Sequence, residues 1–351
     1  MAHNLILRAG AAAQERLVRD GFDPKLFSTM LGASGGPKWL VLSHIDRVLA
    51  RRFVTGRRRR LNLLGSSIGA WRHAALARRE PVAAVEEFER LYIGQAWDKP
   101  PSPGQVTDDS CRMLGILFGD RGRDELLASP DTATHIITVR SKGPLACERR
   151  GPLAFGVATA ALANMLGRRS LGALVERVVF GHDPQAFGFK ERSTRYVGLS
   201  PDNLDDALLA SGAIPLVMTA PRDIAGAPAG VYRDGGILDY HFDFSFTTPP
   251  GLVLFPHFFD RIVPGWFDKR LSWRRVAPKA LDQVLMIAPS PAFIAGLPGA
   301  RIPDRRDFAR LSTRERQTRW RQVVDSCRRL GDELEELLES GQVEDRLVGF
   351  D

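Results

Sequence analysis

The sequence predicts an α/β fold with a largely parallel central sheet, on three observations. The chain has 351 residues, of which 44% are hydrophobic and 26% are charged, a globular composition that can bury a sizeable core. Short apolar segments alternate with helical stretches along most of the chain. Two apolar segments end in glycine-rich turns that lead directly into helical patterns, at residues 31–39 and 61–71. This composition and alternation exclude disordered, collagen-like and fibrous chains.

The alternation predicts the elements in order. The expected strands cover residues 4–7, 27–31, 61–64, 135–139, 177–180, 195–198, 251–255 and 283–287. The clearest expected helices cover residues 39–52, 70–79, 82–92, 153–166 and 204–209, and Pro37 marks the start of the first. We interpret residues 1–311 as one α/β domain. An irregular stretch rich in Pro, Gly and aromatic residues, 249–303, is expected to contain one or two strands and to shape a pocket.

A long amphipathic helix is expected within residues 312–351. Ser312 and Glu315 form a capping box, and apolar residues recur at helical spacing up to Gly341. One continuous helix of ~28 residues would be about 42 Å long. We expect this helix and tail to pack on the domain; the alternative is contact with a partner or a membrane surface.

The charge of the chain leaves two interpretations open. Basic residues outnumber acidic ones, 49 to 41, and all but seven of the basic residues are arginine. Because guanidinium pairs with phosphate through parallel hydrogen bonds, the excess fits anionic partners such as phospholipid head groups or nucleic acid. A compositional bias of the source genome explains it equally well.

Cysteine usage and hydropathy predict a cytoplasmic protein, either soluble or peripheral to a membrane. Cys111, Cys147 and Cys327 are odd in number and lack CxxC or metal-ligand spacing, which favours a reducing compartment. The first residues lack the basic region and apolar core of a signal peptide. No uncharged run reaches the ~20 residues that span a bilayer.

The segment from Leu61 to Trp71 places a G-x-S-x-G motif between a predicted strand and a predicted helix. A nucleophilic serine must protrude from such a sharp turn, and Gly65 and Gly69 remove side chains that would collide with the neighbouring strand and helix. Ser67 would also lie at a helix N-terminus, which favours developing negative charge. The context predicts a catalytic Ser67; the alternative is an ordinary tight turn.

The glycine-rich turn at residues 31–39 resembles a phosphate-binding loop and fails its requirements. Pro37 lacks the N–H that would bind phosphate, and Trp39 cannot ligate Mg²⁺. The N–H groups of Gly35 and Gly36 could instead point together at an oxyanion, with Lys38 adding positive charge or anchoring the loop. The alternative is a turn that serves close packing only.

A third motif is Asp234-Gly235-Gly236, preceded by Ala-Ser-Gly-Ala-Ile-Pro at residues 210–215. Asp-Gly-Gly is also an ordinary turn signal. A carboxylate held on this turn against Ser67 could accept the hydroxyl proton, provided that desolvation raises its pKa from ~3.9.

Taken in order, G-G-x-K, G-x-S-x-G, A-S-x-A-I-P and D-G-G resemble the motifs of patatin-like phospholipases, over residues 27–236. The resemblance implies a three-layer α/β/α fold and hydrolysis of phospholipids or other acyl esters without metal or cofactor. It implies Ser67 as nucleophile, Asp234 as base and the Gly35–Gly36 turn as oxyanion site. Lys38 and Gly235 complete the expected oxyanion and substrate-binding set. The chain lacks the Asn-Pro that often follows D-G-G.

Two alternative sites stay open. A Ser-His-Asp triad in α/β-hydrolase order would use His257 or His241 after Ser67. Asp239, His241 and Asp243 alternate with aromatic residues, so on a strand they would share one face and could hold a metal. We expect no metal there, but a hydrated strand face.

Six arginines, Arg51, Arg52 and Arg57 to Arg60, precede the strand that leads to Ser67. A nucleophile lies at the C-terminal end of its parallel strand, so these arginines should lie about 15 Å or more from the site and not line it. We expect a solvated loop, with an acidic partner, nucleic acid or an anionic membrane as alternatives. A non-enzymatic arginine-rich scaffold is the alternative function, although no nucleic-acid-binding motif is present and no nucleic acid is expected.

An aromatic and basic stretch is a candidate rim for contact with lipid, or a cap on the core. It comprises Phe258, Phe259, Trp266, Phe267 and Trp273, interleaved with Arg261, Lys269, Arg270, Arg274 and Arg275.

Overall fold

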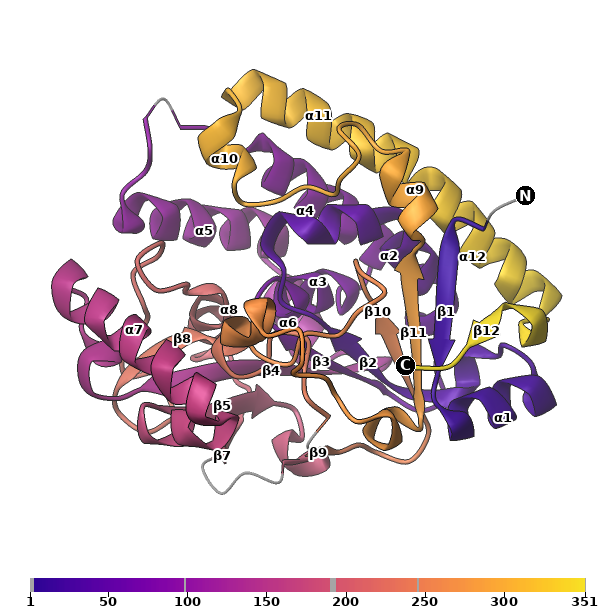
Figure 1. Ribbon diagram of the computed structural model, residues 1–351, viewed down its shortest axis with the longest axis horizontal. Helices are drawn as coiled ribbons and strands as arrows, with labels where there is room; N and C mark the ends of the chain where they lie inside the picture. The colour runs from indigo at the N-terminus through magenta and orange to yellow at the C-terminus, as the bar shows by residue number, and fades with distance from the viewer. Residues whose placement is uncertain (1–2, 98, 190–193, 245, 351) are drawn as a thin grey trace.

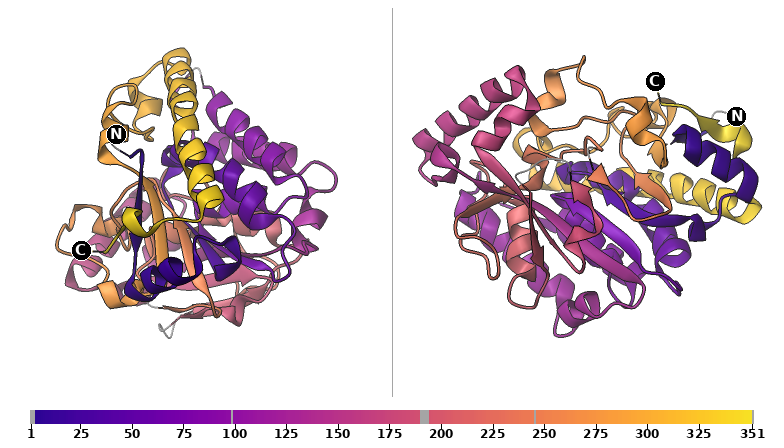
Figure 2. Two further views of the ribbon diagram at one scale, coloured as in Figure 1. Left: turned by 90° about the vertical axis from the view of Figure 1, so that its right-hand side faces the viewer. Right: turned by 90° about the horizontal axis from the view of Figure 1, so that it is seen from below.

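The computed structural model describes residues 3–97, 99–189, 194–244 and 246–350. Within these ranges a mostly parallel sheet of ten strands is flanked by helices, which confirms the predicted α/β/α architecture (Figure 1). The C-terminal helices run along one side of the molecule, and α7 (Arg150–Leu166) lies at the end far from α12 (Arg328–Ser340) (Figures 1 and 2).

The main sheet has the order β12-β1-β11-β10-β2-β3-β4-β5-β7, and β8 pairs with β4. All eight predicted strands are present, as β1 (Leu5–Ala9), β2 (Phe27–Gly32), β3 (Leu61–Ser66), β4 (Thr132–Ser141), β5 (Val175–Gly181), β7 (Thr194–Gly198), β10 (Leu252–Pro256) and β11 (Val284–Pro289). The sequence reading missed β8 (Val231–Asp234) and β12 (Leu347–Val348), and a separate pair, β6 (Gly188–Phe189) with β9 (Phe246–Thr247). Short strands offer too few alternating positions for a pattern to show.

The helices include all five that the sequence makes clearest. They are α1 (Ala11–Asp20), α2 (Ser43–Leu49), α3 (Ile68–Leu76), α4 (Pro81–Gly94), α5 (Pro103–Phe118), α6 (Gly122–Leu127), α7, α8 (Leu204–Gly212), α9 (Pro291–Ala295), α10 (Asp307–Arg310), α11 (Thr313–Ser326) and α12. The helix expected at 39–52 is composite, because a 3₁₀ helix (Gly36–Leu42) precedes α2 and a π-helical turn (Ala50–Val54) follows it.

The single C-terminal helix expected from the sequence is wrong in one respect. The chain forms two helices, α11 and α12, separated at Cys327. The Cys327 N–H is shared between the carbonyls of Val323 and Val324, so the regular hydrogen-bond ladder is interrupted there. The capping box of Ser312 is present. The apolar stripe is buried along both helices, at Trp320, Val323, Val324, Cys327, Leu330, Leu334, Leu337 and Leu338.

Strand β4 determines where the two catalytic candidates meet. Its first half pairs with β3 in parallel, so that Ser66 lies opposite Ile137. Its second half pairs with β8 in antiparallel, so that Asp234 lies opposite Thr138. β3 and β8 therefore run toward each other along one edge of β4 and end on consecutive residues. This register brings Ser67 next to Asp234.

The arginine cluster lies at the opposite end of β3, as predicted. None of its members is among the residues that line the cavity over Ser67 in the described part of the chain. Arg51 and Arg52 pair with Glu335 of α12. Arg57 is not a solvated loop residue, because its guanidinium donates to the backbone carbonyls of Pro24, Phe27 and Phe53. In the described ranges, no helix is both long and apolar enough to cross a bilayer.

Candidate active site

Ser67 occupies a strained turn between β3 and α3, with φ 55° and ψ −130°. A non-glycine residue rarely adopts a positive φ, and strain of this kind is typical of a nucleophile turn. The Ser67 N–H donates to Ser211 Oγ at 2.8 Å, and the Ser211 hydroxyl donates to the Ile137 carbonyl at 2.7 Å. Two successive hydrogen bonds therefore fix the turn to β4.

The glycines on either side of Ser67 permit this close packing. A Cβ on Gly69 would lie 1.9 Å from the Gly32 carbonyl oxygen of β2, and a Cβ on Gly65 would lie 2.5 Å from the Ala70 nitrogen of α3. Both predicted collisions, with the neighbouring strand and with the helix, are confirmed.

The Ser67 hydroxyl donates a hydrogen bond of 2.8 Å to Asp234 Oδ2. The second oxygen, Oδ1, accepts the Gly236 N–H at 2.7 Å, so both donors to the buried carboxylate are neutral. Burial raises the pKa of Asp234 to about 6, while these hydrogen bonds and the positive charges of Arg305 and Lys269 lower it. Asp234 is therefore ionised at neutral pH, yet more basic than an exposed aspartate.

The C-terminal end of α8 and the residue that follows it position both members of this pair, a role that sequence reasoning did not assign. Ser211 holds the backbone of Ser67, and the Ala213 carbonyl accepts the Asp234 N–H at 3.1 Å. Both residues belong to the Ala-Ser-Gly-Ala-Ile-Pro motif at residues 210–215. The signal was present as a motif, but the contacts that explain it join positions far apart in the chain.

The turn of Gly35 and Gly36 lies at the start of a 3₁₀ helix and lines the same cavity as Ser67. In the described part of the chain neither N–H has an acceptor, so both are free to bind an oxyanion. Gly36 has φ 57°, a conformation that favours glycine. A Cβ on Gly35 would lie 2.5 Å from the ring of Phe258. The two glycines are therefore required for two different reasons.

Lys38 lines the same cavity as Ser67, whereas Gly235 is not among the residues that line it. The Lys38 ammonium pairs with Asp304 at 2.5 Å, the anchoring contact that was one of its two expected roles. A Cβ on Gly235 would lie 2.3 Å from the Ile137 carbonyl oxygen. Gly235 therefore permits the close approach of the turn to β4, and its neighbour Gly236 lines the cavity.

A cavity of about 1650 Å³ lies over Ser67 and Asp234. Its walls include Gly212 at the end of α8, residues 214–218, side chains of α5, and parts of the segments 259–269 and 304–316. The irregular stretch at 249–303 thus contributes to a pocket, as expected, although β10 and β11 within it belong to the main sheet. Ile68, Trp71, Met113, Ile214, Leu216 and Val217 give the wall a large apolar share.

Lys269 and Arg305 are among the basic residues that line this cavity, and neither side chain makes an ion pair or hydrogen bond with a described residue. The Lys269 ammonium lies 3.9 Å from the centre of the Tyr240 ring. Burial lowers the pKa of Lys269 to about 7, with a further contribution from the charges of Arg305 and Lys38. Sequence reasoning placed Lys269 in the aromatic and basic stretch but did not associate it with Arg305, because neither residue belongs to a recognisable motif.

In the described chain neither histidine of the alternative triad hydrogen-bonds to Ser67, although His241 lines the same cavity. His257 is fully buried, and its Nδ1 lies 2.6 Å from the Phe259 carbonyl oxygen. His241 packs against His257, with ring centres 4.3 Å apart, and its Nδ1 accepts the Val263 N–H. Burial lowers the pKa of His257 to about 4 and holds that of His241 well below its usual value, so both rings stay neutral.

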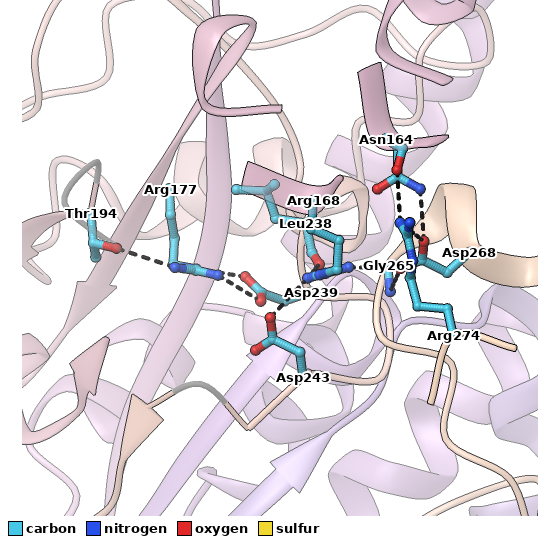
Figure 3. Close-up of polar contacts among 10 residues, drawn as sticks. All are labelled: Asn164, Arg168, Arg177, Thr194, Leu238, Asp239, Asp243, Gly265, Asp268 and Arg274. Carbon is cyan, nitrogen blue, oxygen red and sulfur yellow. Dashed lines mark hydrogen bonds and ion pairs between the residues drawn. The ribbon is translucent and has the colours of Figure 1, made fainter. Parts of the chain in front are cut away.

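Asp239 and Asp243 form ion pairs, which corrects the expectation of a hydrated strand face. The segment after Ile237 is irregular, and Phe242 and Phe244 have positive φ. Asp239 accepts two hydrogen bonds from Arg177, at 2.7 and 2.8 Å, and is fully buried. Figure 3 shows Arg168 between Asp243 and Asp268, with Arg274 and Asn164 also on Asp268. No metal-binding cluster occurs among the residues described.

The fold places the residues of the predicted aromatic rim in different environments. Phe258 belongs to the core, where it packs under Gly35, and Trp266 and Phe267 are half-buried. Arg274 is engaged with Asp268. Trp273 is the strongly exposed aromatic residue of this stretch, at 71%.

A scan of the chain against protein-family models gives no match, and a search of curated proteins finds no similar sequence.

Proposed function

We propose that this chain is a lipid acyl hydrolase of the patatin-like type, which cleaves acyl esters through a Ser67–Asp234 dyad. The observation that carries the proposal is the 2.8 Å hydrogen bond from Ser67 Oγ to a buried carboxylate inside a large, mainly apolar cavity. A serine bonded to a base of raised pKa is the arrangement that nucleophilic catalysis requires.

In the proposed mechanism Asp234 accepts the Ser67 proton as Oγ attacks the ester carbonyl carbon. The carbonyl oxygen becomes an oxyanion that accepts hydrogen bonds from the N–H groups of Gly35 and Gly36. Collapse of this intermediate breaks the ester C–O bond, and the alcohol leaves with the proton from Asp234. Asp234 then deprotonates a water molecule, which attacks the acyl-enzyme, releases the fatty acid and returns the proton to Ser67.

The cavity favours an ester with a long apolar acyl chain and an anionic group. Its apolar wall residues, Trp71, Met113 and Leu216 among them, suit an acyl chain. Lys269 and Arg305 suit a phosphate near the scissile ester, because a partly buried cation without an anionic partner gains most from an anion. Phospholipids combine both features.

The test is a panel of neutral acyl esters and phospholipids, assayed with three proteins. The wild type should release free fatty acid, and Ser67→Ala should lose at least about 10⁴-fold in kcat. Ser66→Ala is the matched control, because Ser66 is the preceding buried serine and its hydroxyl bonds to Ser34 instead of Asp234. Equal activity of the two variants, or no turnover of any ester by the folded wild type, would contradict the proposal.

A further inference from the structure

The outward face of α7 is an apolar surface without a partner in the chain. Four large side chains on it are strongly exposed: Phe155 (66%), Leu162 (65%), Met165 (63%) and Leu166 (88%). Their spacing places them on one side of the helix, opposite the buried Leu153, Gly156, Ala160 and Asn164. We call these four residues the α7 face. A soluble helix usually presents charges on this side.

Between its ends, the exposed side of α7 carries no charged side chain, and its one hydroxyl group is hydrogen-bonded within the helix. No charged residue occurs between Arg150 and Arg168. Thr159 lies at the edge of the face, and its hydroxyl donates to the Phe155 carbonyl at 2.9 Å within the helix. An apolar surface of this kind marks an interaction site.

Arginines lie next to both ends of α7 and in the segment 270–275, which contacts the helix through Arg274. Arg149, Arg150, Arg169, Arg270 and Arg275 are exposed, and none of them makes an ion pair with a described residue. The exposed Trp273 lies beside the C-terminal end of α7, because its neighbour Arg274 donates to the Asn164 carbonyl at 2.8 Å (Figure 3). Apolar residues, an indole and unpaired arginines together are typical of a surface that enters the head-group region of a bilayer.

We propose that the α7 face and Trp273 bind the surface of an anionic lipid bilayer. These exposed arginines fit anionic head groups. A second copy of the chain would instead bring like charges together beside the same apolar face. This inference deepens the proposed function, since it names a membrane as the source of the ester, but the binding itself needs no catalysis.

The helix that carries the α7 face packs directly against residues of the cavity wall. The inner side of α7 packs in one apolar cluster with Ile237 and Trp266, which line the cavity. Leu216 and Val217, also in the cavity wall, are partly exposed, at 41% and 40%. A chain docked through α7 would therefore hold the apolar cavity close to the lipid.

The test is flotation with vesicles, using the full chain with Ser67→Ala so that no lipid is hydrolysed. The vesicles contain phosphatidylcholine alone or phosphatidylcholine with phosphatidylglycerol. The protein should float with the anionic vesicles and dissociate as salt is raised. Adding F155Q and L162Q should weaken binding at least about tenfold, since each side chain loses its transfer into an apolar medium. Val18→Gln is the matched control, because Val18 is also exposed, at 53%, but lies on α1 at the other end of the molecule.

Further variants separate the two contributions. Replacing Arg149 and Arg150 by Gln should lower affinity for anionic vesicles by about fivefold per arginine and leave pure phosphatidylcholine unaffected. Brominated lipid should quench a fluorescence component that Trp273→Phe removes, a readout that leaves α7 intact. Equal flotation of F155Q/L162Q and Val18→Gln, no flotation at all, or a dimer in solution that F155Q/L162Q dissociates would overturn the proposal. Flotation of the Ser67→Ala chain, together with no ester turnover by the wild type, would contradict the hydrolase function alone.

Discussion

Two buried aspartates five positions apart, Asp234 and Asp239, have opposite environments. Asp239 receives both of its short hydrogen bonds from the guanidinium of Arg177, so its negative charge is neutralised (Figure 3). Asp234 receives neutral donors, the Ser67 hydroxyl and the Gly236 N–H, and faces the cavity. Burial alone therefore does not make an aspartate a suitable catalytic base. The two residues differ in whether the carboxylate is paired with a fixed cation.

The largest expected effect is a separation of activity from stability between these two positions. Asp234→Asn should lower kcat by about 10⁴-fold with the fold intact, because the amide cannot accept the serine proton. Asp239→Asn should destabilise the protein by about 3–5 kcal/mol, because the buried Arg177 loses its paired carboxylate. Its folded fraction should keep normal kcat. Ester turnover and chemical denaturation measure both variants, and a similar loss of kcat in the two would remove the distinction.

The oxyanion turn should show the next largest effect. Gly35→Ala places a methyl group against the Phe258 ring and should displace the loop, which costs about 10²–10³ in kcat. Adding Phe258→Leu should restore part of the rate by relieving this contact. Comparing kcat of Gly35→Ala with that of the double variant shows whether the contact with Phe258 causes the loss. Equal rates for Gly35→Ala and wild type would show that this turn does not bind the oxyanion.

The difference in stability between Asp234→Asn and the wild type should depend on pH, because Asp234 titrates only in the wild type. The folded state holds the Asp234 proton more tightly than the unfolded state, with a pKa of about 6 against 3.8. Ionisation therefore destabilises the wild type as pH rises through this window, by up to about 3 kcal/mol. Urea unfolding should find Asp234→Asn more stable than wild type at pH 8 and equally stable near pH 4. A difference in the free energy of unfolding that does not change with pH would mean that burial does not raise the pKa of Asp234.

The smallest expected effect concerns the acid limb of the pH profile. Ester hydrolysis should decline as pH falls through about 6, because Asp234 becomes protonated. The charge of Lys269 lowers the pKa of Asp234, so Lys269→Met should move this limb to higher pH, by less than about one unit. Lys279→Met is the control, since Lys279 is exposed and distant from the cavity wall. A limb that shifts to lower pH, or equally in both variants, would contradict the assignment.

The sequence was informative where local chemistry dictates local structure. The alternation of apolar and helical segments predicted every long strand, and the glycines around Ser67 predicted the close packing that the structure shows. The Ser312 capping box also followed from side-chain chemistry within one turn. In each case the decisive contacts lie near in sequence or follow from a general rule of strand packing.

The sequence could not show what depends on pairing between distant positions. β8 is too short to carry a pattern, yet its register on β4 is what brings Asp234 to Ser67. The alternation of Asp239, His241 and Asp243 suggested a strand, because period two cannot distinguish a strand from an irregular segment whose carboxylates pair with Arg177 and Arg168. The cations of the cavity are likewise placed by tertiary packing alone.

The most direct test of the central claim is to locate the adduct of a fluorophosphonate probe by peptide mass spectrometry. We predict a single adduct on Ser67 of the folded wild type, formed at the same rate in Ser66→Ala and far more slowly in Asp234→Asn. An adduct on another serine, or labelling that is unchanged in Asp234→Asn, would contradict the Ser67–Asp234 dyad.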